Sequence, residues 1–402
     1  MILTTTENQK DLPRYFTRVF DMAKGMQRGR LDFVLPDGRR FRADGAEPGY
    51  VAELQIHNAD IFARLIREGD LGFCDAYLDG WWSTPDLQAF MDLVHDGNDE
   101  MYDGFPGMGL VRAYERMRFW LQSNSKRQAK KNISYHYDLG NDFYALWLDD
   151  TMTYSSALFE PGQNSMEQAQ IAKYASMVDQ MGAKPGDHIL EIGCGWGGFA
   201  EYAAKEYGAH VTGITISKEQ YDFTKNRLRA AGLDHMTDIV MQDYRKLNQR
   251  FDKIVSIEMF EAVGEKYWPV YFKTIANCLK EGGKAALQVI TIDHKAFLEY
   301  RTQPDFIQKY IFPGGMLPSI KALDDPLKTA GLSLHFCQGY GQDYARTLAE
   351  WKVRFHKAWP ELAAITKFDD RFKRMWELYL SYCEGGFKAG MIDVKQMLIT
   401  HK

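Results

Sequence analysis

The chain has 402 residues, enough for two domains, and its net charge of −5 gives no support to general nucleic-acid binding. No apolar run approaches the ~20 residues that a membrane-spanning helix requires. The five cysteines are scattered without disulfide or metal-site spacing, so we expect a reducing compartment and no metal ion.

Residues 1–105 are expected to form a small α+β domain. A hairpin is predicted over 31–43, because Asp37-Gly38 is a common hairpin turn. One helix is predicted within 58–82, ending near Gly69, and another over 86–96.

A basic helical connector is predicted at 106–132. Its apolar residues Leu110, Tyr114, Met117 and Leu121 follow a helical spacing. The segment has one acidic residue, Glu115, and many basic ones. The basic residues are Arg112, Arg116, Arg118, Lys126, Arg127, Lys130 and Lys131. Such a segment could lie on anionic lipid or present a solvated face between domains, and the sequence leaves both open.

Residues 133–402 are expected to form the larger domain, because strand and helix patterns alternate there. Strands are predicted at 188–193, 210–215, 238–242, 253–258 and 285–290, with helices between them such as 218–232. The stretch 343–398 is predicted to be largely helical. Repeated β–α units predict an α/β fold whose mostly parallel sheet binds ligands at the carboxyl ends of its strands.

The strongest local pattern is the glycine loop in HILEIGCGWGGFAEYAAKEYG (188–208). Glycines at 193, 195 and 197 let the backbone bend and let a ligand approach it closely, and the following helix start offers N–H groups to a carboxylate. Glu191, just before the glycines, could meet an amino group. The loop resembles the cofactor loop of class I methyltransferases, which implies S-adenosylmethionine (SAM) rather than a dinucleotide.

Several segments together resemble the cyclopropane fatty-acid and mycolic-acid cyclopropane synthase family. In chain order they are YLDGWW (77–82), SYHYDLGNDFYALWLDDTMTYSSALF (134–159), LEIGCGWGG (190–198), GITISKEQ (213–220), MFEAVG (259–264), KYIFPGGMLPS (309–319) and YCEGGF (382–387). The resemblance covers nearly the whole chain. It implies a Rossmann-like class I SAM-dependent methyltransferase domain preceded by a smaller lipid-interacting or dimerising domain.

The resemblance also implies the cofactor contacts. They are Tyr154, Ser155, Glu191, Gly193, Cys194, Gly195, Gly197, Thr215, Ile216, Ser217, Gln220, Asp243 and Tyr244. Thr215, Ser217 and Gln220 stand where many methyltransferases have an acidic ribose ligand, and Asp243 would meet the adenine.

The implied reaction transfers the SAM methyl carbon to a cis double bond of a phospholipid acyl chain, with a bound bicarbonate as base. The enzyme would then work from the cytoplasm at the inner face of the membrane, and a homodimer is left open. Bicarbonate ligands are implied at Glu261, Tyr344 and the backbone of Ile290. Cys383 matches an active-site cysteine of the family, but no step of the implied reaction needs a thiolate, so a buried structural cysteine is equally open. His136 is expected to organise the mouth of the pocket.

Two departures leave the product open: Ser156 stands at the usual cysteine and Gln288 at the usual histidine. Both side chains can hydrogen-bond an anion, which would preserve cyclopropane formation. A shifted base would instead take a proton from a neighbouring chain carbon and leave a methyl-branched or furan-precursor unsaturated acid. A methyltransferase for a small soluble acceptor and a non-catalytic SAM-binding protein at a lipid surface are the other hypotheses.

Overall fold

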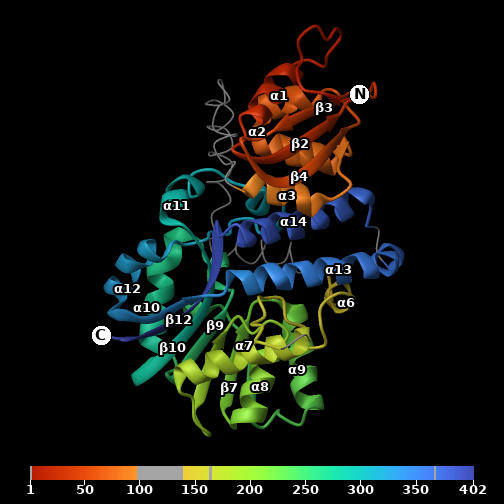
Figure 1. The fold of residues 1–402 in the computed structure, drawn as a ribbon. Coiled ribbons are helices and arrows are strands. Elements are labelled where there is room, and N and C mark those ends of the chain that lie inside the picture. Colours follow the sequence, from red (N-terminus) through yellow and green to blue (C-terminus); the bar gives the residue numbers. More distant parts are fainter. Residues whose placement is uncertain (1, 97–138, 163–164, 366–367) are drawn as a thin grey trace. The chain divides into compact units, whose positions relative to one another are not determined.

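The computed structural model describes residues 2–96, 139–162, 165–365 and 368–402 (Figure 1). These residues divide into two compact units. The first comprises the described parts of 1–121, 302–311 and 363–391, and the second the described parts of 122–301, 312–362 and 392–402. The predicted connector at 106–132 lies outside the described residues.

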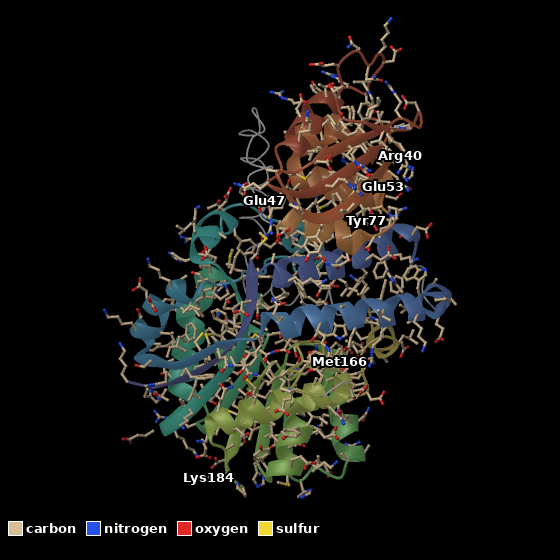
Figure 2. All side chains as sticks on the ribbon, viewed as in Figure 1. Arg40, Glu47, Glu53, Tyr77, Met166 and Lys184 are labelled. Atoms are coloured by element: carbon tan, nitrogen blue, oxygen red, sulfur yellow. The ribbon has the colours of Figure 1, made fainter. Side chains whose placement is uncertain are left out.

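The first unit contains a five-stranded mixed sheet of order β1-β3-β2-β4-β5 among the residues that the structure describes. Its elements are β1 (Ile2–Leu3), α1 (Phe16–Lys24), β2 (Arg28–Val34), β3 (Arg40–Asp44), β4 (Glu47–Ile56), α2 (Ile61–Leu78), β5 (Trp82–Ser83), α3 (Leu87–His95), the π-helix η5 (Ile307–Ile311) and α14 (Asp370–Lys388). Figure 2 labels Arg40 on β3 and Glu53 on β4, which form an ion pair. The predicted hairpin is confirmed by the antiparallel pairing of β2 with β3.

One sequence expectation is confirmed in this unit and one changes. The helix predicted to end near Gly69 is interrupted there, because Gly69 has non-helical backbone angles (φ 63°, ψ −148°), and a second helical stretch follows within α2. The segments 302–311 and 363–391, which the sequence prediction includes in the catalytic domain, belong here. The reason is the amphipathic α14, which buries residues such as Trp376 and Leu380 and packs against α2 and α3.

The second unit contains a seven-stranded sheet of order β11-β12-β10-β9-β6-β7-β8 within the described part of the chain. Its strands are β6 (His188–Ile192), β7 (His210–Thr215), β8 (Thr237–Met241), β9 (Phe251–Ile257), β10 (Leu279–Ile292), β11 (Leu332–Gly339) and β12 (Ile392–His401). The five predicted strands and the mostly parallel sheet are confirmed. The stretch 343–398 is largely helical, as predicted, through α13 (Gly341–Ile365) and α14, but its last residues form β12, which pairs antiparallel with β10 and β11.

Helices and short helical turns connect these strands. They are α6 (Asn141–Ala145), α7 (Met166–Met181), α8 (Gly198–Tyr207), α9 (Lys218–Ala230), η2 (Tyr244–Lys246), η3 (Phe260–Ala262), η4 (Glu265–Tyr267), α10 (Trp268–Cys278), α11 (His294–Tyr300), η6 (Ile320–Leu323), α12 (Asp324–Ala330) and α13 (Gly341–Ile365). Helices α7, α8 and α9 share one apolar core with the sheet, and α10 packs on β10 and α12. Met166, labelled in Figure 2, opens α7, whose buried residues include Gln170 and Lys173.

The order of the strands fixes where a ligand can bind. From β6 the chain moves to β7 and β8 on one side, and then returns to β9 and β10 on the other. Open α/β sheets bind ligands at the carboxyl ends of the strands that border such a reversal. Here those strands are β6 and β9, which pair directly. The glycine loop follows β6, and Glu258 follows β9.

Neither a membrane span nor a metal centre is found among the described residues. No helix there combines the length and the apolarity that crossing a bilayer requires. Within the same ranges, no group of histidine, cysteine and acidic side chains is arranged to hold a metal ion.

Candidate active site

The glycine loop after β6 is shaped by three residues with positive φ: Gly193 at 83°, Gly195 at 50° and Gly197 at 83°. A Cβ on Gly193 would lie 2.7 Å from Cγ of Met259, and one on Gly197 would lie 2.5 Å from Cγ2 of Thr224. Packing therefore requires glycine at these two positions. A Cβ on Gly195 would meet nothing within 4 Å, so the loop leaves open space at that point.

Cys194 contributes to this loop mainly through packing. Its side chain is buried in the core shared by α7, α8 and α9, where burial raises the pKa of the thiol. Its backbone N–H, like that of Gly193, donates to the carbonyl of Ile214 at 3.0 Å. Cys194 can therefore contact the cofactor only through its backbone, because its side chain is packed in the core.

Glu191 is the acidic residue closest in sequence to the loop. Its side chain is buried, and its Oε2 atom has no hydrogen-bond partner among the described residues. Burial raises the pKa of this carboxyl, while the positive charges of Lys173 and Arg227 oppose the rise. An unpaired buried oxygen of this kind fits the amino group of an amino-acid ligand.

The predicted ribose and adenine residues gather at the adjacent ends of β7 and β8. The Thr215 hydroxyl donates to Oε1 of Gln220 at 2.8 Å, and Ser217 caps α9 by accepting from the backbone of Gln220. The Asp243 carboxylate accepts from Nε of Arg245 at 2.8 Å. Ile216 and Tyr244 lie in the same two loops, so the structure brings this predicted set together.

The segment Tyr154–Ser156 is fixed by α7 and by aromatic packing. Lys173 Nζ donates to Oγ of Ser155 and to Oε1 of Gln170, each at 2.6 Å. Burial lowers the Lys173 pKa to about 7, although the charge of Glu258 opposes this. The Tyr154 ring lies 5.2 Å from the ring of Trp351 and 5.4 Å from that of Tyr144.

Glu258, which the sequence reasoning missed, is at the centre of the predicted anion site. Its carboxylate accepts three hydrogen bonds: from the Ser156 backbone N–H at 2.8 Å, from Gln288 Nε2 at 2.8 Å and from the Tyr344 hydroxyl at 2.6 Å. All three donors belong to residues predicted to hold bicarbonate. The available signal was position, since Glu258 directly follows β9 at the reversal of the sheet.

The Ser156 hydroxyl does not take part in this arrangement. It donates to the Ala157 carbonyl at 2.9 Å, so Ser156 contributes through its backbone. The Gln288 side chain is held from its other end, because its Oε1 accepts from Nε2 of Gln396 at 3.1 Å.

Glu261 is a second carboxyl beside Glu258. Its Oε1 atom accepts from the Ile290 N–H at 2.5 Å, and its buried Oε2 has no partner in the described part of the chain. Burial, and then the charge of Glu258, raise the Glu261 pKa to about 8. Burial also raises the pKa of Glu258, but its Tyr344 hydrogen bond and the Lys173 charge oppose that rise. Glu258 accepts three hydrogen bonds and Glu261 one, so Glu258 is the better placed of the two to carry the charge and Glu261 to hold the proton.

For two further residues the predicted role stays a prediction. His136 lies outside the described residues. Cys383 lies on α14 of the first unit, where burial, and then the charge of Asp305, raise the pKa of its thiol.

We expect Cys383→Ala to keep the turnover of the wild type per folded molecule, because a thiol with a raised pKa supplies little thiolate. The free energy of unfolding should instead decrease by about 1 kcal/mol, as is usual when a small buried side chain is shortened. Turnover and thermal unfolding of the same preparation check this. A large fall in turnover at unchanged stability would instead support a catalytic role.

A family model described as mycolic acid cyclopropane synthetase matches residues 124–397. The chain belongs to this family. It is 38% identical over 392 residues to tuberculostearic acid methyltransferase UfaA1 of Mycobacterium tuberculosis, covering 92% of this chain and 88% of the relative. It is also 38% identical over 353 residues to the cyclopropane-fatty-acyl-phospholipid synthase of Escherichia coli K12, covering 87% and 88%.

Solved structures of the cyclopropane synthetase family have the same fold. The cyclopropane synthase MmaA2 of M. tuberculosis matches with a TM-score of 0.63 at 31% identity, over 67% of this chain and 97% of that one. The mycolic acid cyclopropane synthase CmaA1, in complex with SAH and CTAB, matches with a TM-score of 0.63 at 30% identity, over 68% and 98%. This chain is therefore a SAM-dependent methyltransferase with a class I α/β fold.

The residues of this chain fit SAM but not bicarbonate. The unpaired Glu191 oxygen and the open space at Gly195 suit the amino-acid part of SAM. The donors implied for bicarbonate are already engaged: those of Ser156, Gln288 and Tyr344 by Glu258, and that of Ile290 by Glu261.

Proposed function

We propose that this protein transfers the methyl carbon of SAM to a double bond in an unsaturated phospholipid acyl chain and forms a cyclopropane ring. One observation carries the proposal: a loop that suits SAM follows β6, and the paired carboxyls of Glu258 and Glu261 follow the adjacent strand β9. The 38% identity to the E. coli cyclopropane-fatty-acyl-phospholipid synthase supports the same substrate class. Because that substrate is part of a bilayer, we propose that the enzyme works at the inner face of the membrane.

Different residues would bind the cofactor and position the double bond in this methyl transfer. Bound SAM supplies an electrophilic methyl group on a positively charged sulfur. Glu191 holds the amino group of the cofactor, and the backbone at Gly195 lets it approach the loop. An alkene is a weak nucleophile, so most of the rate must come from positioning the double bond in a water-poor site.

The same residues must also stabilise the positive charge that methylation leaves on the acyl chain. The ionised Glu258 supplies an opposite charge, and aromatic rings such as Tyr144, Tyr154 and Trp351 offer faces that attract cations. The reaction is complete when a base removes a proton.

Ring-free methylation is a second candidate, favoured by a specific observation at Ser156. Its hydroxyl is turned to the Ala157 carbonyl and does not join the site where the usual cysteine would act. The relative that is 38% identical over 92% of this chain is named a methyltransferase, not a cyclopropane synthase. In this version the proton leaves a neighbouring chain carbon, and the product keeps a double bond.

We expect expression of this chain in a bacterium without its own synthase to add the mass of one CH2 group to unsaturated acyl chains. Mass spectrometry of the phospholipid fatty acids, against an empty vector, provides the measurement. Mild hydrogenation then separates the products, since a retained double bond takes up hydrogen and a cyclopropane does not. A folded, SAM-binding protein that leaves the lipids unchanged would refute the proposal.

A further inference from the structure

We infer that Glu258 is the base of this reaction and takes the place of a bound bicarbonate, so that the enzyme needs no added anion. The inference rests on the proposed function for its substrate. Its basis is the set of hydrogen bonds around the Glu258 carboxylate, which come from residues expected to hold bicarbonate.

The available space and hydrogen-bond donors do not allow bicarbonate and the Glu258 carboxylate to occupy the site together. Ser156 and Gln288 are 1% and 3% exposed, and each points a donor at Oε1 of Glu258. Tyr344 donates to the other oxygen, Oε2, so both carboxylate oxygens are held in place. A bicarbonate bound by the same donors would have to overlap the Glu258 carboxylate. The two remaining implied ligands, Glu261 and the Ile290 N–H, are already joined to each other, because that N–H donates to Oε1 of Glu261.

Electrostatics also disfavours an added anion. Glu258 and Glu261 are close enough for the charge of one to raise the pKa of the other, and the cation that acts on Glu258 is Lys173. Buried charges are tolerated when they are paired. A bound bicarbonate would add a negative charge next to Glu258, whose charge already interacts with Lys173, and the added charge would have no cation of its own among the side chains that the structure describes.

The backbone holds Glu258 in an unusual conformation that only its contacts explain. Its φ is 49°, a left-handed value that costs a residue with a Cβ about 1 kcal/mol or more. The Glu258 N–H donates to the Gln288 carbonyl at 2.8 Å, which fixes this bend against β10. Strained residues persist where the surrounding structure over-determines them, and this strain turns the carboxylate toward Ser156 and Tyr344.

The base step balances within the chain and its substrates. The methyl carbon leaves sulfur and bonds to one alkene carbon, and the other alkene carbon becomes cationic. A Glu258 oxygen then takes a proton from the transferred methyl group. The electron pair of that C–H bond forms the third bond of the ring. The proton resides on Glu258 until it is released to solvent before the next turnover.

Binding of ¹³C-labelled bicarbonate to the S-adenosylhomocysteine-bound protein tests the inference without any lipid. We expect no binding by the wild type, and saturable binding by Glu258→Ala, whose vacated donors would accept the anion. Glu281→Ala is the matched control, because Glu281 is an exposed glutamate on β10, the strand that carries Gln288. Saturable binding to the wild type, or none to a folded Glu258→Ala protein, would overturn the inference.

Turnover on vesicles of an unsaturated phospholipid gives the second readout. In CO2-free buffer the wild type should reach the rate that it shows with added bicarbonate. Glu258→Ala should lose about 10²–10⁴-fold, as expected for a missing general base, and regain part of the rate with bicarbonate or formate. Glu258→Gln, which preserves the shape of the side chain, should lose as much without recovery.

These results separate the two proposals. A wild type that alkylates the vesicles only when bicarbonate is present would refute the role of Glu258 and leave the proposed function intact. A wild type that never alkylates them would refute the proposed function, while the bicarbonate titration still decides whether Glu258 fills the anion site. Unchanged cofactor affinity in each variant shows that the protein is folded.

Discussion

Replacing Gly195 with valine is expected to abolish SAM binding and leave a folded protein. A Cβ at this position meets no protein atom within 4 Å, so the added side chain would fill the open space that the loop leaves for a ligand. We expect the affinity for SAM to fall at least about 100-fold, since the loop could no longer approach its ligand closely. Isothermal titration with SAM provides the measurement.

Gly232→Val is a closely matched control for this experiment. Gly232 has a φ of 71°, close to the 50° of Gly195, and a Cβ there also meets nothing within 4 Å. Both variants should therefore lose a similar stability, about 1–2 kcal/mol, from the left-handed backbone. Only Gly195→Val should lose its affinity for SAM. Equal SAM affinity in the two variants would mean that the loop does not contact the cofactor.

Local patterns explain why the sequence predicts most of the sheet and the cofactor loop. A run of apolar residues followed by glycines and a helix is encoded within about 20 neighbouring residues, as at 188–208. The strands of the second unit repeat that pattern, so their positions and direction follow. The residues at the ends of β7 and β8, such as Thr215 and Asp243, are then placed by topology alone.

The anion site could not be derived in this way, because it depends on contacts between distant segments. Glu258 meets Ser156, Gln288 and Tyr344, which are separated from it by 102, 30 and 86 positions. Sequence reasoning identified the donors but assigned them to a bound ion. Only the structure shows that Glu258 accepts hydrogen bonds from these donors, because its backbone bends at a positive φ.

The end of the chain shows a similar limit. Residues 392–398 fall within the stretch expected to be largely helical, yet they form β12, because the sheet offers hydrogen-bonding partners on both sides of that strand. Tertiary pairing overrides local preference at such positions. In the same way α14 is an ordinary amphipathic helix by pattern, and only its packing on α2 and α3 assigns it to the first unit.

The paired carboxyls should also control how stability depends on pH. The Glu261 pKa is raised from its ordinary 4.5 to about 8, so between these values the folded state binds more protons than the unfolded state. Stability must therefore fall as pH rises through this window, and the penalty is absent below the unfolded pKa. Lys173 acts in the opposite direction, since its pKa is lowered from 10.5 to about 7 and its penalty is relieved as pH rises.

Glu261→Gln isolates the contribution of Glu261 from that of Lys173. The variant cannot ionise, so its melting temperature minus that of the wild type should be constant below about pH 4.5, increase up to about pH 8 and then level off. The full increase should be on the order of 5 °C. Because Glu261 is expected to act in its neutral form, the variant should keep turnover of the same order as the wild type. Glu281→Gln, at an exposed position, should follow the wild-type curve. A difference that stays flat across pH 5–8 would mean that Glu261 is already ionised in this range, which would contradict the assignment of the proton to Glu261.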